Sequence, residues 1–334
     1  MRIATYNVEW FTGLFDEQDQ LIKDGSWSSR RDVTKAEQID ALSVVFQTLD
    51  SDAIMVIEAP DQNGRRSTVA ALEGFANAFD LRTNKAIIGF SNDTQQEIAL
   101  LYDPDVVRVK HNPHGSFDAP RFDQEFHIDL DVDENQDIVQ FSKPPLELEL
   151  TTLTNQTLRL IGVHLKSKAP HGARNAADVM RISIANRRKQ LAQAIWLRRR
   201  VVRYLEANEH LIVLGDLNDG PGLDEYEDLF GRSSVEIVMG EKGKNCLHDP
   251  HARAALSRRL GAKPTTSRFY IHKDKRFLQA LLDYIMVSES LRSKRPEWRI
   301  WHPFDDQACW HDPKLRQALL TASDHFPVTL DLDI

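Results

Sequence analysis

Short apolar runs alternate with longer amphipathic segments along the whole chain of 334 residues. Apolar runs of about four to eight residues predict strands, and apolar positions spaced three and four apart predict helices. The pattern predicts strands at residues 3–8, 53–57, 86–90, 98–102, 106–110, 146–150, 158–165, 211–214, 281–287 and 327–332. It predicts helices at residues 35–49, 67–79 and 176–206.

The third predicted helix has one apolar face, and its arginines are expected on the opposite face. That apolar face is formed by Ile182, Ala185, Leu191, Ala194, Ile195, Leu197, Val201 and Val202. Many strands and few helices predict a layered α+β sandwich with sheets inside and helices outside. We expect a single domain over residues 1–334. The least regular stretches, 111–145 and 220–276, are expected to form loops near a substrate.

Composition narrows the class of protein. An apolar content of 41% allows a large core, and no run of about 18 apolar residues predicts a membrane span. The first residues, MRIATYNVEW, lack the apolar region of a signal peptide, so we expect a cytoplasmic protein. Cys246 and Cys309 provide neither a disulfide framework nor metal-ligand spacing.

Charge is unevenly distributed along the chain. The net charge of −8 argues against bulk electrostatic coating of nucleic acid, but it permits a nuclease whose carboxylates bind cations. Residues 118–137 are strongly acidic, and residues 187–203 are basic without any acid. Each run is explained by a solvated surface. Alternatively, the acidic loop gates the site, excludes a substrate or binds cations, and the basic helix contacts the substrate.

Polar side chains that can bind metal recur where the predicted strands begin or end. They are Asn7, Glu58, His164, Asp216, Asn218, Asp283, Asp324 and His325. A turn or a structural histidine explains each one alone. Together they suggest a site, because several buried carboxylates need cations or hydrogen bonds to compensate them. Hard oxygen ligands suit Mg²⁺, Mn²⁺ or Ca²⁺, and two histidines can exchange protons near neutral pH.

Six motifs around these residues resemble the endonuclease/exonuclease/phosphatase superfamily, which includes pancreatic deoxyribonuclease and the exonuclease III-type enzymes. In order, they are ATYNVEWF, VIEAPD, GVHLKS, GDLNDGPG, LLDYIMVS and SDHFPV. The resemblance spans residues 3–330. It implies a four-layer α/β/β/α sandwich, with two mixed β-sheets flanked by helices, and hydrolysis of phosphoesters with a divalent metal.

The resemblance also implies roles on the metal side of the site. Glu58 resembles the main metal ligand, with Asn7 beside it. Asp324 resembles a further carboxylate on the metal side. Asp216 and Asn218 resemble the pair that positions the attacking water and the phosphate, or a second cation. The implied ion is Mg²⁺ or Mn²⁺, with Ca²⁺ as an alternative.

For proton transfer, His325 resembles the histidine beside the scissile phosphate, and Asp283 resembles the carboxylate that orients it. The stretch EIALLYDPD resembles one in pancreatic deoxyribonuclease in which a glutamate, here Glu97, supports a second histidine, here His164. Abasic-site enzymes of the superfamily carry tyrosine near the position of His164. The histidine therefore favours the deoxyribonuclease-like or phosphodiesterase branches. Which histidine acts as base and which as acid is left open.

Basic residues near these motifs have two interpretations. Lys166 and Lys168 follow His164 closely, and either contact phosphate or are solvated at the surface. Arg187 and Arg188 either meet a phosphate backbone or form structural ion pairs.

The resemblance favours a nuclease acting on DNA. The alternative is a phosphoesterase acting on a phospholipid, a sugar phosphate or another small phosphoester. Apolar loop residues would favour a lipid, and three tryptophans keep that option open, namely Trp298, Trp301 and Trp310. A non-enzymatic scaffold would show substitutions among the implied catalytic residues, and the sequence has none. No protein partner is implied.

Overall fold

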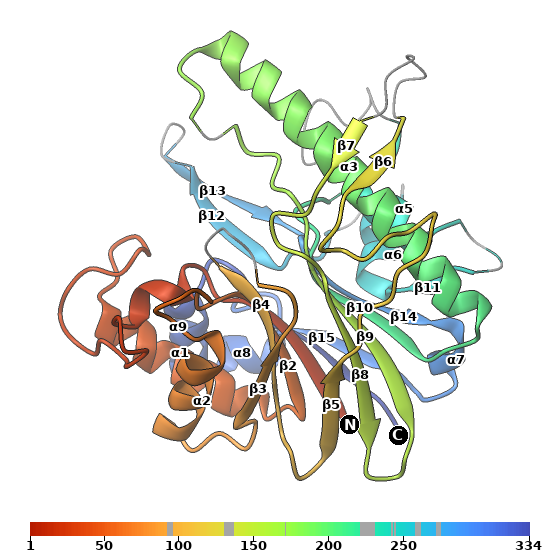
Figure 1. Cartoon of the computed structure of the whole chain (residues 1–334). Helices are drawn as coiled ribbons and strands as arrows, with labels where there is room; N and C mark the ends of the chain where they lie inside the picture. Colours follow the sequence, from red (N-terminus) through yellow and green to blue (C-terminus); the bar gives the residue numbers. More distant parts are fainter. Residues whose placement is uncertain are drawn as a thin grey trace.

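The computed structural model describes residues 1–91, 96–129, 137–170, 172–220, 231–241, 243, 245–257, 262–271 and 275–334. Two six-stranded mixed sheets pack face to face, and helices cover their outer faces (Figure 1). This arrangement confirms the predicted α/β/β/α sandwich.

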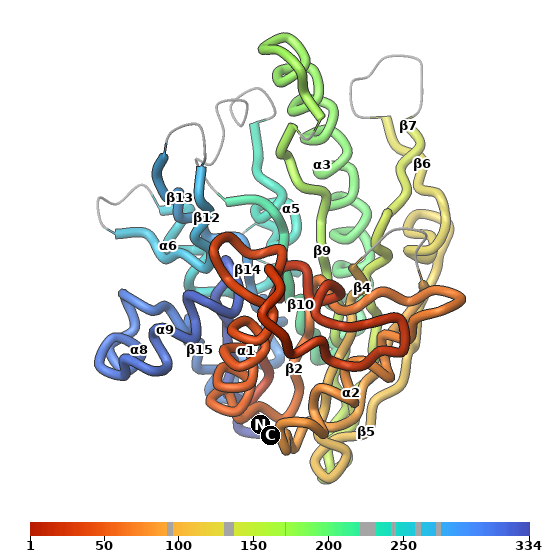
Figure 2. Tube along the Cα trace, turned by 90° about the vertical axis from the view of Figure 1, so that its left-hand side faces the viewer, coloured from red at the N-terminus to blue at the C-terminus, as the bar shows by residue number. Residues whose placement is uncertain are grey.

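The first sheet is antiparallel except at its centre, where β1 and β2 run parallel. Its strand order is β15 (Glu297–Ile300), β16 (Val328–Asp331), β1 (Arg2–Asn7), β2 (Ala53–Ala59), β4 (Glu97–Tyr102) and β3 (Lys85–Ile88). The last residues of the chain lie beside the first, since the Met1 amino group donates to the Leu332 carbonyl over 2.6 Å (Figure 2).

The second sheet has the same plan, with β9 and β10 as its parallel central pair. Its strand order is β11 (Leu247–His248), β14 (Asp283–Ser288), β10 (Leu211–Asp216), β9 (Thr157–His164), β8 (Leu146–Thr152) and β5 (Val107–His111). Parallel neighbours end at the same edge of a sheet, so each sheet gathers two strand ends at its centre.

Helices close the outer face of each sheet through an apolar core. The first sheet is covered by η1 (Phe11–Leu14), α1 (Lys35–Leu49), α2 (Thr68–Ala78), α8 (Gln307–His311) and α9 (Pro313–Ala322). The second is covered by α3 (Ala176–Glu206), α5 (Ser234–Met239) and α6 (Pro250–Leu256). The short α7 (Glu289–Arg292) follows β14 directly. Between the sheets lies a third apolar core, where Gly162 of β9 leaves room for the side chain of Met55.

The observed elements include all the predicted strands and helices, and α1 and α3 match their predicted bounds. Among the described residues, the edge strands β11 and β15 and the helices η1, α5, α6, α7, α8 and α9 were not predicted. The hairpins β6 (Phe126–Ile128)–β7 (Asp137–Val139) and β12 (Ser267–Ile271)–β13 (Arg276–Ala280) were not predicted either. The expectation that the α3 arginines face away from the core is wrong for Arg187 and Arg200. Both are buried, because Asp219 and Glu147 pair with them.

Candidate active site

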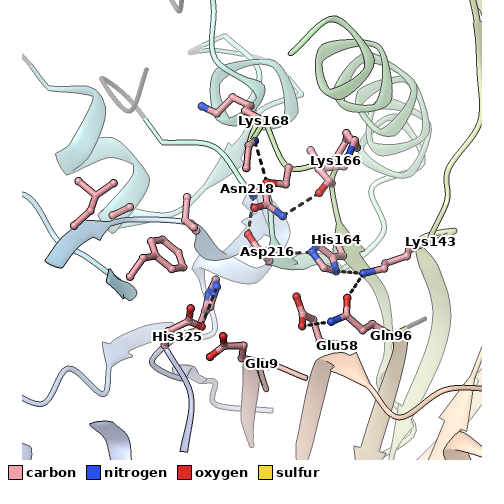
Figure 3. A pocket seen from close by; sticks show the side chains of 18 of the residues that line it. Glu9, Glu58, Gln96, Lys143, His164, Lys166, Lys168, Asp216, Asn218 and His325 are labelled. Carbon is pink, nitrogen blue, oxygen red and sulfur yellow. Dashed lines mark hydrogen bonds and ion pairs between the residues drawn. The ribbon is translucent and has the colours of Figure 1, made fainter. Parts of the chain in front are cut away.

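Polar side chains converge where the parallel strands of both sheets end. In the first sheet, Asn7 is the last residue of β1, and Glu58 lies near the end of β2. In the second sheet, Asp216 of β10 pairs in register with His164 of β9 and with Asp283 of β14. Glu58, His164 and Asp216 line one pocket of about 830 Å³ (Figure 3).

Glu58 is aimed into this pocket by a break in its strand. Its backbone is left-handed, with φ of 60°, at a bulge where the pairing with β4 shifts register. A bulge re-aims a side chain, and a strained backbone of this kind is typical of functional sites. Its Oε2 atom accepts hydrogen bonds from the Trp10 backbone at 3.2 Å and from Gln96 at 2.6 Å. Burial raises the pKa of Glu58, although the positive charge of Lys143 opposes the shift.

Asp216 connects the two sheets. Its carboxylate accepts a hydrogen bond from the Asn7 side chain at 3.1 Å and from the Asn218 backbone at 2.7 Å. Asn218 has a left-handed backbone, with φ of 49°, and its side chain donates to the Leu165 carbonyl at 3.0 Å. Burial and, next, the charge of Asp283 raise the pKa of Asp216 to about 7.

His325 forms a buried pair with Asp283. Its Nδ1 atom lies 2.7 Å from Asp283 Oδ2, which also accepts a hydrogen bond from the Thr266 hydroxyl at 2.8 Å. Burial alone would lower the pKa of His325, but Asp283 and then Asp216 and Asp324 together raise it well above its ordinary value. The carboxylate therefore orients the ring and makes it more basic.

A chain of polar contacts joins Glu58 to His164 through two residues that the sequence reasoning missed, Gln96 and Lys143. The Lys143 ammonium donates to Gln96 Oε1 at 2.8 Å and lies 3.5 Å from His164 Nδ1, while His164 Nε2 lies 3.8 Å from Asp216 (Figure 3). Burial and, next, the charge of Lys143 hold the pKa of His164 well below its ordinary value. His164 is therefore neutral at pH 7.

Glu97, the predicted support for His164, is buried at the start of β4. Its negative charge acts on Lys143, where it opposes the lowering of the pKa by burial. The neighbouring Gln96, whose backbone is left-handed with φ of 72°, lines the pocket instead.

Asp324 lies on the other side of the pocket, next to His325 Nε2 at 3.9 Å. Burial raises the pKa of Asp324 to about 7, and the positive charge of His325 opposes this shift. Arg30 lies behind it, 4.0 Å from Asp324 and in an ion pair with Glu9. Glu9, which was not predicted, therefore adds a further carboxylate to the pocket wall.

The predicted basic residues occupy different places. Lys166, Lys168 and Arg187 line the pocket. Lys168 and the buried Arg187 both pair with Asp219, at 2.6 and 3.1 Å. Arg188 instead pairs with Asp137 at 3.3 Å and is not one of the described residues that line the pocket.

One wall of the pocket is apolar and comes from the β12–β13 hairpin, through Phe269, Ile271 and Leu278. The predicted tryptophans lie elsewhere: Trp298 donates to the Ile285 carbonyl, and Trp301 donates to Thr329. Trp310 packs beside Phe304. Residues 130–136 of the predicted acidic loop, and parts of 220–276, lie outside the described residues.

The oxygen atoms of this site fit a divalent cation. Three buried oxygens, Asn7 Oδ1, Asp283 Oδ1 and Asp324 Oδ1, accept no hydrogen bond from any described residue. Ligand atoms of Asp216, Asp283 and His325 lie within 4.8 Å of one another, as in a metal-binding cluster. Carboxylate and amide oxygens are the ligands that Mg²⁺ and Mn²⁺ prefer.

The sequence matches one protein family, and the fold is similar to that of several solved structures. The sequence profile of the Endonuclease/Exonuclease/phosphatase family matches residues 4–325. A truncated Caenorhabditis elegans TDP2 has 13% identity and a TM-score of 0.51, over 98% of this chain and 96% of that one. SmcL has 13% identity and a TM-score of 0.52, over 100% and 99%. A family protein from Bacteroides thetaiotaomicron has 15% identity and a TM-score of 0.50, over 99% and 96%.

Curated protein sequences show no significant match to the chain. Within the described ranges, no helix combines the length and apolar character that a membrane crossing needs.

Proposed function

The chain belongs to the endonuclease/exonuclease/phosphatase family and is a metal-dependent phosphoesterase, and from this premise we propose that it is a nuclease that hydrolyses phosphodiester bonds in DNA. The main support for the proposal is that one pocket contains two histidines whose pKa values are shifted in opposite directions. His325 is made basic by Asp283, and His164 is kept neutral by burial beside Lys143. The ammonium groups of Lys143 and Lys166 give the same pocket positive charge, which suits a phosphate backbone.

Five oxygen-bearing residues would hold the Mg²⁺ or Mn²⁺ ion, namely Asn7, Glu58, Asp216, Asn218 and Asp324. When bound, the cation neutralises a non-bridging phosphate oxygen and stabilises negative charge on the leaving oxygen. Ca²⁺ prefers the same oxygen ligands and is the alternative ion.

The proton chemistry follows from the contacts of the two rings. The Asp283 carboxylate accepts a hydrogen bond from the N–H at Nδ1 of His325. The Nε2 atom is therefore free to accept a proton from the attacking water. Lys143 can donate to His164 Nδ1, which places the ring hydrogen on Nε2. We therefore assign His325 as the general base and His164 as a neutral hydrogen-bond donor to the phosphate.

A substrate panel with Mn²⁺ tests the proposal. It contains plasmid DNA, single-stranded DNA, RNA, bis-p-nitrophenyl phosphate, p-nitrophenyl phosphate and phospholipid vesicles. We expect hydrolysis of DNA and of the synthetic diester, with His325→Ala as a control of strongly reduced activity. Activity on the monoester but not on the diesters would overturn the nuclease proposal.

The apolar wall formed by Phe269, Ile271 and Leu278 favours a second candidate, hydrolysis of a phospholipid head group. An acyl chain or a glycerol backbone could pack against this wall, as a nucleobase could. Turnover of vesicles without turnover of nucleic acid would establish this candidate instead.

A further inference from the structure

A second cavity of about 650 Å³ adjoins the pocket and shares three wall residues with it, Glu9, Phe269 and Asp324. The β12–β13 hairpin contributes residues to the walls of both cavities. Side chains alternate across a strand, so one face of the hairpin turns Ile271 and Leu278 toward the pocket. The other face lines the second cavity with Arg268, Tyr270 and Phe277.

The hairpin is held to the catalytic residues through its backbone. The Arg268 N–H donates to the Asp324 carbonyl at 2.7 Å, and the Phe326 N–H donates to the Thr266 carbonyl at 2.6 Å. Ser267 and His325 form an antiparallel bridge between these bonds. The second cavity is thus fixed in position relative to His325.

Two guanidinium groups in this cavity lie over aromatic rings. Arg31 lies 3.6 Å from the ring centre of Tyr270, and Arg268 lies 3.5 Å from that of Phe277. A stacked guanidinium keeps its N–H edges available, and these edges match the two oxygens of a phosphate. The aromatic ring holds the side chain in place, which lowers the entropy lost on binding.

The charges around the cavity leave Arg268 without a counterion. Arg30 is engaged by Glu9, and Arg31 pairs with Asp32 at 3.1 Å. No carboxylate of a described residue lies within ion-pair distance of the Arg268 guanidinium, and burial lowers the pKa of this group. A partly buried guanidinium that has no counterion gains from binding an anion.

We propose that the second cavity binds a neighbouring phosphate of a nucleic acid strand while the scissile phosphate occupies the pocket, and that Arg268 is its main contact. This inference rests on the proposed nuclease function and narrows its substrate to a chain with at least two phosphates. A phospholipid with a single phosphodiester would leave Arg268 unused.

The test compares Arg268→Ala with wild type on two substrates in Mn²⁺, octathymidylate and bis-p-nitrophenyl phosphate. We expect kcat/KM for octathymidylate to fall about 10-fold or more beyond any fall on the small diester, mainly through KM, as loss of a charge-assisted hydrogen bond predicts. The slope of log KM against log salt should decrease in magnitude by about 0.7, the value for one phosphate contact to a single strand. Arg268→Lys should recover only part of the loss, because it keeps the charge without the planar fork.

Arg316→Ala is the matched control, since it removes a guanidinium stacked on Trp310 away from both cavities, and it should leave both substrates unaffected. Equal losses on both substrates would show that Arg268 supports the fold of the site, and no loss on either would show that it binds nothing; both results overturn the subsite. If the wild type cleaves the small diester but no nucleic acid, the nuclease function itself fails, and the subsite fails with it.

Discussion

The Oδ2 atom of Asp283 lies 2.7 Å from Nδ1 of His325, although 42 residues separate the two in sequence. Asp283 is the first residue of β14, next to Asp216 in register, and the Thr266 hydroxyl fixes the same oxygen. The imidazole ring is therefore oriented by a carboxylate that is itself held in place. A ring held in this way has a defined tautomer, with its Nε2 atom free for proton transfer.

Replacing the ring tests its role as the base. His325→Ala should lower kcat by about 10² or more, because general-base losses are of this size, while KM changes little. Steady-state kinetics on bis-p-nitrophenyl phosphate measures both constants. His311→Ala, which removes an exposed histidine at the end of α8, is the control. A change confined to KM would contradict the assignment.

Removing the negative charge of Asp283 should shift the pH dependence of kcat/KM. The neutral ring is the base, so activity rises as pH passes upward through the pKa of His325, which its acidic neighbours raise. Asp283→Asn removes one of these charges, so the rising limb of kcat/KM should shift to lower pH while the maximal rate falls. A pH profile from about pH 5 to 9 measures the shift. If the rise of kcat/KM with pH is unchanged in Asp283→Asn, that rise reflects the titration of a group other than His325.

Patterning explains how much of this site could be predicted from the sequence. Strand ends can be predicted, because an apolar run that stops at a polar residue marks the edge of a sheet. This pattern identified Asn7, Glu58, His164 and Asp216 as residues at strand ends. The bulge at Glu58 and the contact of Lys143 with Gln96 leave no such signal. Both depend on how distant segments meet, and Lys143 belongs to a stretch without periodicity.

Burial of polar side chains was the other feature that patterning missed. The sequence predicts exposed arginines on α3, but Arg200 is buried because Glu147 of β8 faces it from inside the sheet. The helix α9 is a different case, because its signal was present: Asp312 and Pro313 mark a start, and Leu315, Ala318, Leu319 and Ala322 form one apolar face.

Removing the metal should abolish activity, and the structure adds a readout that does not depend on turnover. Burial raises the pKa of Asp216 and Asp324 to about 7 from an ordinary value of 3.8. Between those values the unfolded carboxyls are ionised and the folded ones are protonated, so their contribution to stability falls as pH rises. In EDTA we expect this contribution to lower Tm as the pH rises from about 4 to about 7.

Mg²⁺ or Mn²⁺ should restore activity, and it should raise Tm more at pH 8 than at pH 5, because the ion binds the ionised carboxylates. Glu58→Gln keeps the shape of the side chain and should reduce the metal-induced rise in Tm, as differential scanning fluorimetry would measure. Full activity in EDTA, or equal Tm shifts in Glu58→Gln and wild type, would contradict the metal assignment.

The buried pair of Arg200 and Glu147 should matter for stability rather than for chemistry. Arg200→Met would leave Glu147 charged and buried without its cation, at a cost of about 3–5 kcal/mol in the free energy of unfolding. Urea denaturation measures this loss, and the double variant with Glu147→Leu should recover part of it. The exposed pair of Arg292 and Glu289 is the control, where Arg292→Ala should cost less than about 1 kcal/mol. Similar losses in both variants would contradict the argument.

Lys143 should support activity by positioning Gln96 and by lowering the pKa of His164. Its ammonium donates to Gln96, which donates to Glu58, and its charge is the second cause, after burial, of the low pKa of His164. Lys143→Met keeps the length and removes the charge, so the pKa of His164 should rise, as a titration of its ring protons by NMR would measure. We also expect kcat to fall about 10-fold or more, as for loss of one charge-assisted hydrogen bond. Lys85→Met, at an exposed ion pair with Glu73, is the control. A fall in kcat with no shift in the His164 titration would mean that Lys143 contacts the phosphate directly instead of tuning the ring.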